Sequence, residues 1–444
     1  MKYNTVIVGG GLAGLAASFE LASHHKQTLL LESEGVLGGR TSSWNDNGMY
    51  IESGFHRFIG YYSNLPKLLR RAGVQLNDIL MWEEKFHVRI NDKKPIVMGV
   101  APILGIPEMI KGIAGNNEYL SPKDKLSLVP FFLKGFKDYA VNPKKLDQIS
   151  VKEYARQNGV TESVFHKLLV PLSAGVYFLP PDRFSAFVFF GLFAPGVLKF
   201  YKMRIGAFLG GMTEVMCNPI GEKIKEMGGQ IKLNSQVKEL IIEHNHVKGV
   251  ILENGEKIET ENVILAVTLH SAKQLLTPHF KHHSWFTPLF ELPLMPAVVI
   301  QIETNEPSLP MDITTFAPYT CLASFAEQSR TTFQESSGRL SIILSPPKKF
   351  LETDPEQTLR HVIEDAKKIG INLEGRIKGY RKINHHYDFH TLEPGYQHLR
   401  PAQKTPIPGL FLAGDYTQQP YFATMEGAVT SGMLAANALL REGG

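Results

Sequence analysis

The chain of 444 residues has little cysteine and no long uninterrupted apolar run. Its two distant cysteines, Cys217 and Cys321, indicate neither a disulfide framework nor a cysteine-based metal site. The most apolar segment, 184–200, is interrupted by one proline and two glycines, and the first ten residues lack the apolar stretch of a signal peptide. We therefore expect a cytoplasmic protein without a membrane-spanning helix.

The chain also lacks a strong excess of charge of either sign. It has 47 Lys and Arg against 43 Asp and Glu, a formal net charge of +4 at pH 7. This mild charge argues against a nucleic-acid partner but is compatible with an anionic membrane surface. What the chain does have is a hydrophobic content of 43%, which predicts a sizeable core in two domains or one large composite domain.

A nucleotide-binding pattern opens the chain. A short β-branched run predicts a buried strand, and Gly9, Gly11 and Gly14 follow it as G-x-G-x-x-G. Gly9 permits a tight turn, Gly11 lets a pyrophosphate approach the backbone, and Gly14 lets the next helix pack on the strand. That helix, whose first turn includes Leu12 and Ala13, offers free N–H groups to the phosphates.

Two further features support dinucleotide binding. The second predicted strand ends at Glu32, where an acidic side chain can bind the ribose hydroxyls of adenosine. Gly38 and Gly39 then predict another backbone turn against the same phosphates, and Arg40 adds a cation at the pyrophosphate or near a flavin. A purely structural turn leaves Glu32 and the three glycines unexplained.

These motifs resemble those of the flavin-containing amine oxidase and carotenoid desaturase superfamily, which carries G-x-G-x-x-G, an acidic residue and then G-G-R. The resemblance implies tightly held FAD rather than exchangeable NAD. The stretch 48–74 is similar to the plant and cyanobacterial phytoene desaturases through residues that include Glu52, Gly54 and His56. Gly54 and Phe55 are expected beside the flavin, whereas His56 is either a flavin neighbour or a structural histidine.

A second motif, "GDYTQQPYFATMEGA", lies near the end of the chain. Gly414 and Asp415 end a predicted strand, with Asp415 placed for the ribityl or phosphate end of FAD. A helix is predicted to begin near Met425, so that Met425, Glu426 and the helix N–H groups face the flavin pyrimidine ring. Amine oxidases of the superfamily place an aromatic residue where this chain has Thr424, while plant-type desaturases have a small residue there. No cysteine lies near this loop, so we expect non-covalent FAD.

The resemblance implies an α/β fold in which a Rossmann-like FAD-binding domain is interleaved with a mixed α+β substrate-binding domain. The FAD-binding domain is expected to comprise 1–84, 205–267 and 396–444, and the substrate-binding domain 85–204 and 268–395. Within the latter, lysines flank the apolar residues of 104–140, which is either a core helical segment or a membrane-associating patch.

The expected activity is desaturation of a long apolar isoprenoid, such as phytoene or a carotene, by hydride transfer to flavin N5, with a quinone or O2 as acceptor. Val215 stands where plant-type desaturases carry an arginine, which leaves the identity of the isoprenoid open. The alternatives are a flavin amine oxidase, a squalene-pathway flavoenzyme, a protoporphyrinogen oxidase and a non-enzymatic isoprenoid-binding flavoprotein. His56 and Arg400 are the candidate catalytic side chains. No metal site is expected at the histidines of 384–390, because Asp388 is the only nearby carboxylate.

The motifs and the resemblance together predict one set of cofactor-binding residues. These are Gly9, Gly11, Leu12, Ala13, Gly14, Glu32, Gly38, Gly39, Arg40, Gly54, Phe55, His56, Val237, Gly414, Asp415, Met425, Glu426 and Ala428. In the superfamily, the position of Val237 meets the adenine through its backbone.

Overall fold

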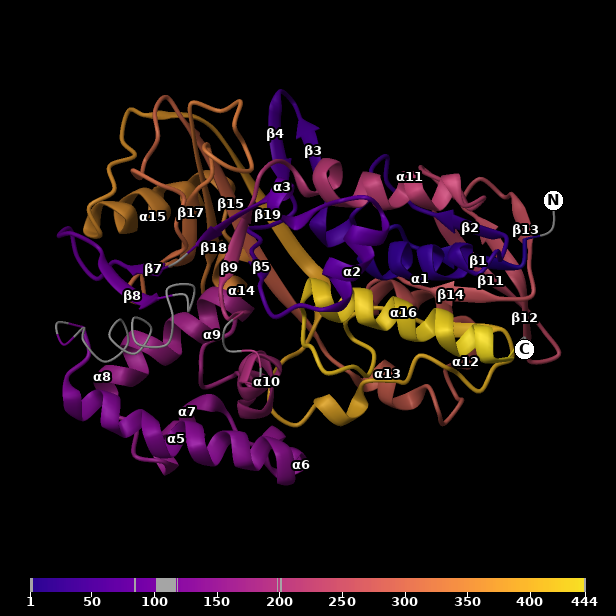
Figure 1. The fold of residues 1–444 in the computed structure, drawn as a ribbon, viewed down its shortest axis with the longest axis horizontal. Helices are drawn as coiled ribbons and strands as arrows, with labels where there is room; N and C mark the ends of the chain where they lie inside the picture. The colour runs from indigo at the N-terminus through magenta and orange to yellow at the C-terminus, as the bar shows by residue number, and fades with distance from the viewer. Residues whose placement is uncertain are drawn as a thin grey trace.

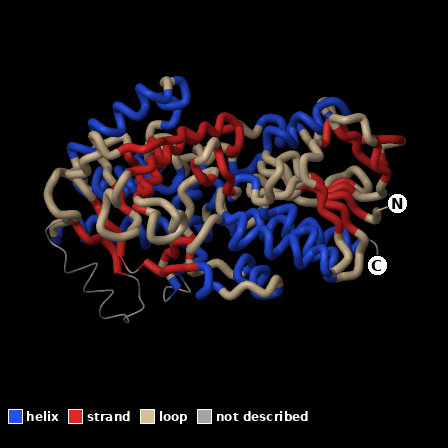
Figure 2. Tube along the Cα trace, turned by 90° about the horizontal axis from the view of Figure 1, so that it is seen from above, coloured by secondary structure: helices blue, strands red, loops and turns tan. Residues whose placement is uncertain are grey.

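The structure is a computed structural model that describes residues 3–83, 85–100, 117, 119–197, 199 and 202–442. It is elongated, with both termini beside a parallel sheet at one end and a larger antiparallel sheet at the other (Figure 1). Viewed from above, the strands gather toward these two ends, and helices lie on both sides of the molecule (Figure 2). Of the segment 104–140, residues 104–116 and 118 lie outside the described residues.

The parallel sheet has five short strands in the order β10-β2-β1-β14-β20. Its strands are β1 (Thr5–Val8), β2 (Thr28–Leu31), β10 (Gln230–Lys232), β14 (Val263–Leu265) and β20 (Leu410–Leu412). Strands β1 and β2 are buried at every position, as parallel strands covered on both faces require. Three separate parts of the chain therefore build one sheet.

Helices cover one face of this sheet. Side chains such as Ile7 and Leu30 pack there against α1 (Leu12–Ser23), α11 (Asn218–Glu226) and α16 (Met425–Glu442). Helices α1 and α16 approach closely because Gly432 has no side chain. A Cβ at this position would lie only 2.1 Å from the carbonyl oxygen of Ala13. The first and last helices of the chain are thus packed side by side (Figure 1).

The opposite face of the parallel sheet carries β11 (Val237–Glu243), β12 (His246–Leu252) and β13 (Lys257–Glu259), which pair antiparallel. It also carries α12 (Leu269–Phe280) and α13 (Thr287–Glu291), whose apolar residues pack with Val6 and Val8. The sequence places these two helices in the substrate-binding domain, which is expected to resume at residue 268. Their packing corrects that boundary, because the chain leaves the parallel-sheet core only at β15 (Leu294–Thr304).

The larger sheet has seven strands in the order β19-β15-β18-β17-β16-β7-β8, all antiparallel neighbours except β16 and β7. Besides β15 they are β7 (Lys85–Val88), β8 (Ile96–Val100), β16 (Thr315–Phe316), β17 (Leu322–Glu327), β18 (Gly338–Leu344) and β19 (Ile377–His390). Alternation along β15 places Val298 and Ile300 against a core that includes α15 (Pro355–Lys368), with α14 (Pro347–Glu352) beside it, and Val299 on the other face.

A helical layer faces that second side. It consists of α5 (Pro122–Val141), α6 (Pro143–Asp147), α7 (Val151–Gln157), α8 (Glu162–Val164), the turn Phe165–Leu169, α9 (Val170–Tyr177) and α10 (Ala186–Val197). Helix α5 begins at a capping box, in which Ser121 and Asp124 bond each other's backbone N–H groups. A phenylalanine-rich core joins α5, α7 and α10.

Short elements connect the two ends. They are the 3-10 turn Gly39–Thr41, β3 (Ser43–Asp46), β4 (Met49–Glu52), β5 (Phe58–Ile59), α2 (Asn64–Arg71), α3 (Leu76–Ile79), β6 (Leu80–Glu83), β9 (Ile205–Phe208), the turn Thr213–Cys217 and the 3-10 turn Gln397–Leu399. Strands β5, β9 and β6 form a small antiparallel sheet, and β3 pairs with β4. The loop 53–57 therefore runs between the parallel sheet and the larger sheet.

Candidate flavin-binding site and cavity

The glycine-rich turn after β1 forms a cradle at the start of α1. Gly9 has a φ of +107°, a conformation that L side chains rarely adopt. A Cβ at Gly14 would lie 1.9 Å from the carbonyl oxygen of Gly9, so only glycine allows this approach. At Gly11, by contrast, the nearest heavy atom to a Cβ would be 3.8 Å away. Helix α1 starts at Leu12 with no side-chain cap and no acid in its first turn, which leaves its N–H groups free for an anion.

The second glycine pair lies against this cradle. Gly38 bridges to Gly11, and Gly38 and Gly39 have φ values of +125° and +55°. Arg40, directly after them, forms an ion pair with Asp415 at 2.5 Å. Its guanidinium also lies 4.7 Å from the ring centroid of Phe389. The structure thus brings the N-terminal and C-terminal motifs together through Arg40 and Asp415.

Glu32 lies at the carboxyl edge of the parallel sheet, directly after β2. Its carboxylate accepts hydrogen bonds from the N–H of Gly10 at 2.5 Å and from Ser33 and Glu34 at 2.9 Å each. A carboxylate has about four lone-pair sites, so acceptor capacity remains for a ribose hydroxyl. The carbonyl of Glu32 accepts from the N–H of Ser235, which brings the segment before Val237 to the same edge.

Buried polar atoms without hydrogen bonds mark the region around Asp415. Oδ2 of Asp415 and both ring nitrogens of His390 are buried and have no hydrogen bond within the described residues, and Nδ1 of His390 lies 3.8 Å from Oδ2 of Asp415. Burial, together with the charges of Arg400 and Arg40, lowers the pKa of His390 to about 3, so its ring is neutral. Burial disfavours the Asp415 carboxylate, but the surrounding positive charges, chiefly that of Arg40 together with Arg400, outweigh burial and lower the pKa of Asp415. Buried polar atoms in proteins normally have a hydrogen-bond partner, so these atoms indicate a polar ligand. The ribityl and phosphate groups of FAD offer suitable partners.

Arg400 does not line the cavity described below. Its guanidinium donates to the carbonyl oxygens of Asp415 at 2.9 Å and Thr417 at 2.5 Å and lies 4.9 Å from the ring centroid of Phe422. Burial lowers the pKa of Arg400 to about 10. Arg400 therefore holds the loop that carries Asp415, a structural role in place of the catalytic one expected from the sequence.

The start of α16 corrects a second expectation. The Glu426 carboxylate is fully buried and accepts hydrogen bonds from the N–H groups of Ser63, Asn64 and Leu65. Its side chain therefore caps the N-terminus of α2 and does not face the flavin region. Met425 does line the cavity, and the two differ because consecutive helical residues project about 100° apart.

The residues before Met425 shape the same region. Thr424 caps α16 by accepting a hydrogen bond from the N–H of Gly427 at 3.1 Å, and the N–H of Ala428 bonds the Thr424 carbonyl. Gly414 has a φ of +138°, and its N–H donates to Ser431 at 2.8 Å. These bonds fix the loop and the start of α16, whose first residue, Met425, lines the cavity.

A cavity of about 310 Å³ joins these loops to the larger sheet. Arg40, Gly54, His56, Thr424 and Met425 line it from the flavin-binding motifs. Its remaining lining is mainly aromatic and aliphatic and includes Phe55, Tyr61, Tyr62, Tyr177, Phe178 and Phe389. The structure thus places an apolar chamber beside the predicted flavin loops.

His56 faces this cavity with its ring folded over Gly54. A Cβ at Gly54 would lie 2.7 Å from Cε1 of His56, so the ring position depends on the glycine. Burial and the positive charges of His385 and Arg40 lower the pKa of His56 to about 4. Its Nδ1 is buried without a hydrogen-bond partner in the described part of the chain. His56 is therefore a neutral imidazole beside the apolar chamber.

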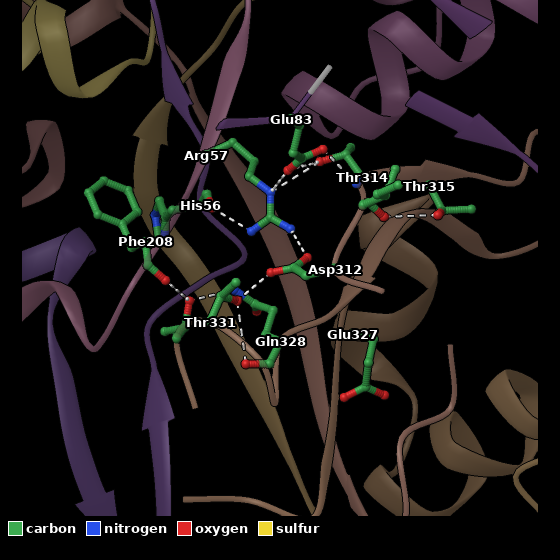
Figure 3. A network of polar contacts seen from close by, with 12 residues as sticks. His56, Arg57, Glu83, Phe208, Asp312, Thr314, Thr315, Glu327, Gln328 and Thr331 are labelled. Carbon is green, nitrogen blue, oxygen red and sulfur yellow. Dashed lines mark hydrogen bonds and ion pairs between the residues drawn. The ribbon is translucent and has the colours of Figure 1, made fainter. Parts of the chain in front are cut away.

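A buried polar network that the sequence did not reveal supports the loop 53–57 (Figure 3). Arg57 forms ion pairs with Glu83 at 2.5 Å and with Asp312, and its Nε donates to Thr314 at 3.1 Å. Its guanidinium lies 4.6 Å from the ring centroid of Phe55, which it holds against the cavity. Burial disfavours the Arg57 cation, but Asp312 and Glu83 outweigh it and raise the pKa of Arg57.

The described residues lack two other features, a metal-binding cluster and a membrane-spanning helix. No group of three or more His, Cys, Asp or Glu side chains there could hold a metal ion. No helix among them is long and apolar enough to cross a membrane.

Comparison with known proteins identifies the family. A model of the family described as flavin containing amine oxidoreductase matches residues 12–440. The 15-cis-phytoene desaturase of Solanum lycopersicum is 30% identical over 465 residues, covering 98% of this chain and 77% of that protein. The same enzyme of Synechococcus elongatus is 29% identical over 461 residues, covering 98% of this chain and 95% of that protein.

The fold is shared with solved structures. An oxidoreductase from Methanosarcina mazei superposes with a TM-score of 0.74 at 19% identity and covers 99% of this chain and 100% of its own. The family match spans nearly the whole chain, and the open glycine cradle and the unpartnered polar atoms near Asp415 fit the cofactor. The chain therefore belongs to the flavin-containing amine oxidoreductase family and is a FAD-dependent oxidoreductase.

Proposed function

We propose that the enzyme desaturates a long apolar isoprenoid, of the phytoene or carotene class, in the cavity beside the flavin loops. The observation that carries this proposal is the 310 Å³ cavity with its mainly aromatic and aliphatic lining. An apolar chain binds by burying surface and needs no polar partner. The two relatives named above are 15-cis-phytoene desaturases, which supports the same substrate class.

We propose the following placement of FAD on this chain. The pyrophosphate lies at the N–H groups of Leu12 and Ala13, the ribose at Glu32, and the ribityl chain near Asp415, with the adenine at the backbone of Val237. The flavin ring then lies beside Gly54 and Met425. No cysteine occurs near Asp415, so the FAD is expected to be released by acid precipitation.

Bound FAD supplies the acceptor for the hydride that the substrate loses. The cavity residues position the chain and exclude water, which this reaction needs more than a strong base. The substrate also loses one proton, and His56, neutral and facing the cavity, is our candidate to take it. Overall the substrate gives up two electrons and two protons, and a quinone or O2 finally receives the electrons.

Thr424 argues against the amine oxidase alternative. The flavin-side aromatic wall that would hold an ammonium by cation–π contact is absent at this position, where a helix-capping hydroxyl stands instead. Ala423, directly before it, has a φ of +45°, so the backbone is held in a rare conformation at this wall. An amine would therefore enter an apolar chamber without that partner.

Anaerobic reduction of the bound flavin tests the proposal. The purified enzyme is mixed with phytoene, ζ-carotene, a hydroxylated squalene precursor and a panel of amines, each with lipid. We expect loss of flavin absorbance with an isoprenoid and none with simple amines. Rapid reduction by an amine alone would replace the proposal with an amine oxidase. Reduction by no compound would favour an isoprenoid-binding flavoprotein.

We also propose that the protein, which we place in the cytoplasm, associates peripherally with a membrane through α5. Leu126 and Leu133 on this helix are each 70% exposed, and Val129 between them is 51% exposed. The spacing places the three on one helical face, and the exposed Lys134 and Lys137 lie nearby. Apolar residues flanked by lysines fit an anionic membrane surface, from which an isoprenoid could be drawn.

A further inference from the structure

A histidine and an aspartate on β19 contact the flavin-side loop in a way that the proposed reaction does not use. Strand β19 is irregular here, since Ala297 of β15 pairs with His385 and Met295 pairs with Phe389. Three residues of β19 thus stand opposite one residue of β15, and the extra length forms a bulge. The buried side chain of His385 contacts Asp388 at the other end of the bulge. It also contacts the carbonyl oxygen of Ser53 in the flavin-side loop.

Both ring nitrogens of His385 face oxygen atoms that accept hydrogen bonds. Nδ1 lies 2.6 Å from Oδ2 of Asp388, and Nε2 lies 2.6 Å from the carbonyl oxygen of Ser53. Burial disfavours the Asp388 carboxylate, but the hydrogen bond and charge of His385 outweigh it and lower the pKa of Asp388. A carboxylate and a carbonyl oxygen only accept hydrogen bonds, so both contacts are satisfied together only when both ring nitrogens donate, as they do in an imidazolium ring.

We propose that both ring nitrogens of His385 carry hydrogen, so that His385, held by Asp388, is a positioning residue that fixes the Ser53–Gly54 peptide and places a positive charge beside the flavin. This charge stabilises the reduced cofactor and raises its midpoint potential. The proposal rests on the placement of FAD given above, but it does not depend on which substrate is oxidised.

The location of the pair carries this role. His385, Ser53, Gly54 and Arg40 all line the same cavity. The Ser53 carbonyl receives the imidazolium hydrogen bond, which polarises the peptide and makes the Gly54 N–H a stronger donor. Within the described ranges that N–H donates to no protein acceptor, so it is free for the flavin.

The charge balance also favours the reduced flavin. Uptake of two electrons and one proton leaves one additional negative charge on the ring system. Of the charged groups around the loop, Arg40 is paired with the buried Asp415, and His56 is neutral. The side chain of Asp388 is 39% exposed, so water partly screens its negative charge. The charge of the buried His385 ring is screened less and therefore acts more strongly on the flavin.

The test compares the midpoint potential of the purified holoenzyme and its variants by dye-coupled reductive titration at pH 7. His385→Gln retains a donor for the Ser53 carbonyl but removes the charge. We expect the ratio of reduced to oxidised flavin at a fixed potential to fall about tenfold, which for a two-electron couple is about 30 mV. FAD affinity, measured by fluorescence titration of the apoprotein, should change about threefold or less.

Two more variants complete the test. Asp388→Ala, at a half-exposed position that folding tolerates better, removes the acceptor for Nδ1 and should lower the potential in the same direction. His386→Gln changes the exposed neighbouring histidine, which does not line the cavity, and should leave the potential at the wild-type value. Unchanged potentials in both His385→Gln and Asp388→Ala, or an equal shift in His386→Gln, would overturn the proposal. Because no substrate is added, these outcomes are independent of the isoprenoid assay.

Discussion

Glu426 offers a direct test of how the C-terminal motif works. Its carboxylate receives the N–H groups of Ser63, Asn64 and Leu65, all at 2.7–2.9 Å, so it links α16 to the start of α2. The substitution Glu426→Gln removes the negative charge. It also places an amide nitrogen, which cannot accept a hydrogen bond, against one of the backbone N–H groups. Losing a charge-assisted hydrogen bond and leaving one buried N–H unpaired should cost about 2–4 kcal/mol of unfolding free energy.

The measurement is the thermal midpoint of the apoprotein and the dissociation constant of FAD. We expect the midpoint to fall by roughly 2–4 °C, because the unfolding entropy of a chain of this length is large, while FAD affinity changes little once the protein is folded. Glu239→Gln, at an exposed strand position, is the matched control and should have no effect on either quantity. A variant with a normal midpoint but FAD binding weakened tenfold would show that Glu426 contacts the cofactor, and that its capping role is wrong.

Three further predictions address the cofactor, pH and the membrane. Glu32→Ala should weaken FAD binding by roughly ten- to a hundredfold, the value of a charged hydrogen bond, with the exposed neighbour variant Glu34→Ala as control; equal FAD affinities in both would contradict the ribose role. Burial raises the pKa of Glu52 to about 8, so folding stability should fall as pH rises from about 4.5 to 8. Glu52→Gln should flatten this part of the profile of thermal midpoint against pH, and parallel profiles would refute the assignment. Replacing Leu126 and Leu133 by serine should abolish flotation with anionic vesicles without changing flavin content; undiminished flotation would exclude α5 as the contact.

The parts of the site that the sequence predicts are those whose chemistry is local. Gly9, Gly11 and Gly14 are separated by fixed short spacings, and the backbone geometry they permit is nearly independent of the rest of the chain. The position of Glu32 is also predicted locally, because the carboxyl end of a parallel strand lies at the sheet edge where a nucleotide binds. Arg40 directly follows a glycine pair and Asp415 ends a predicted strand, so both are also predicted locally, and the structure joins these two in an ion pair.

Other parts depend on contacts between distant segments, which no local pattern encodes. Arg57, Glu83 and Asp312 come from three separate segments, and only the folded chain shows that they form one network (Figure 3). The boundary at 268 was misplaced for a related reason, because an amphipathic helix does not reveal which of two sheets it will cover. Glu426 was misassigned because a motif fixes the position of a residue but not the phase of its helix.

The charges around the cavity bear on the direction of the proposed reaction. Removing a hydride from a neutral hydrocarbon makes the substrate positive and the flavin negative, so a favourable site separates two kinds of surroundings. Arg40 and His385 lie with the flavin-binding loops. Much of the remaining cavity lining is aromatic. The negative faces of aromatic rings attract a cation, so they stabilise the positive charge that develops on the substrate more than they stabilise the neutral polyene. Under this reasoning, replacing Phe178 by leucine should lower the rate of flavin reduction by an isoprenoid more than it weakens binding of that isoprenoid. A loss confined to binding would show that Phe178 contributes only apolar surface.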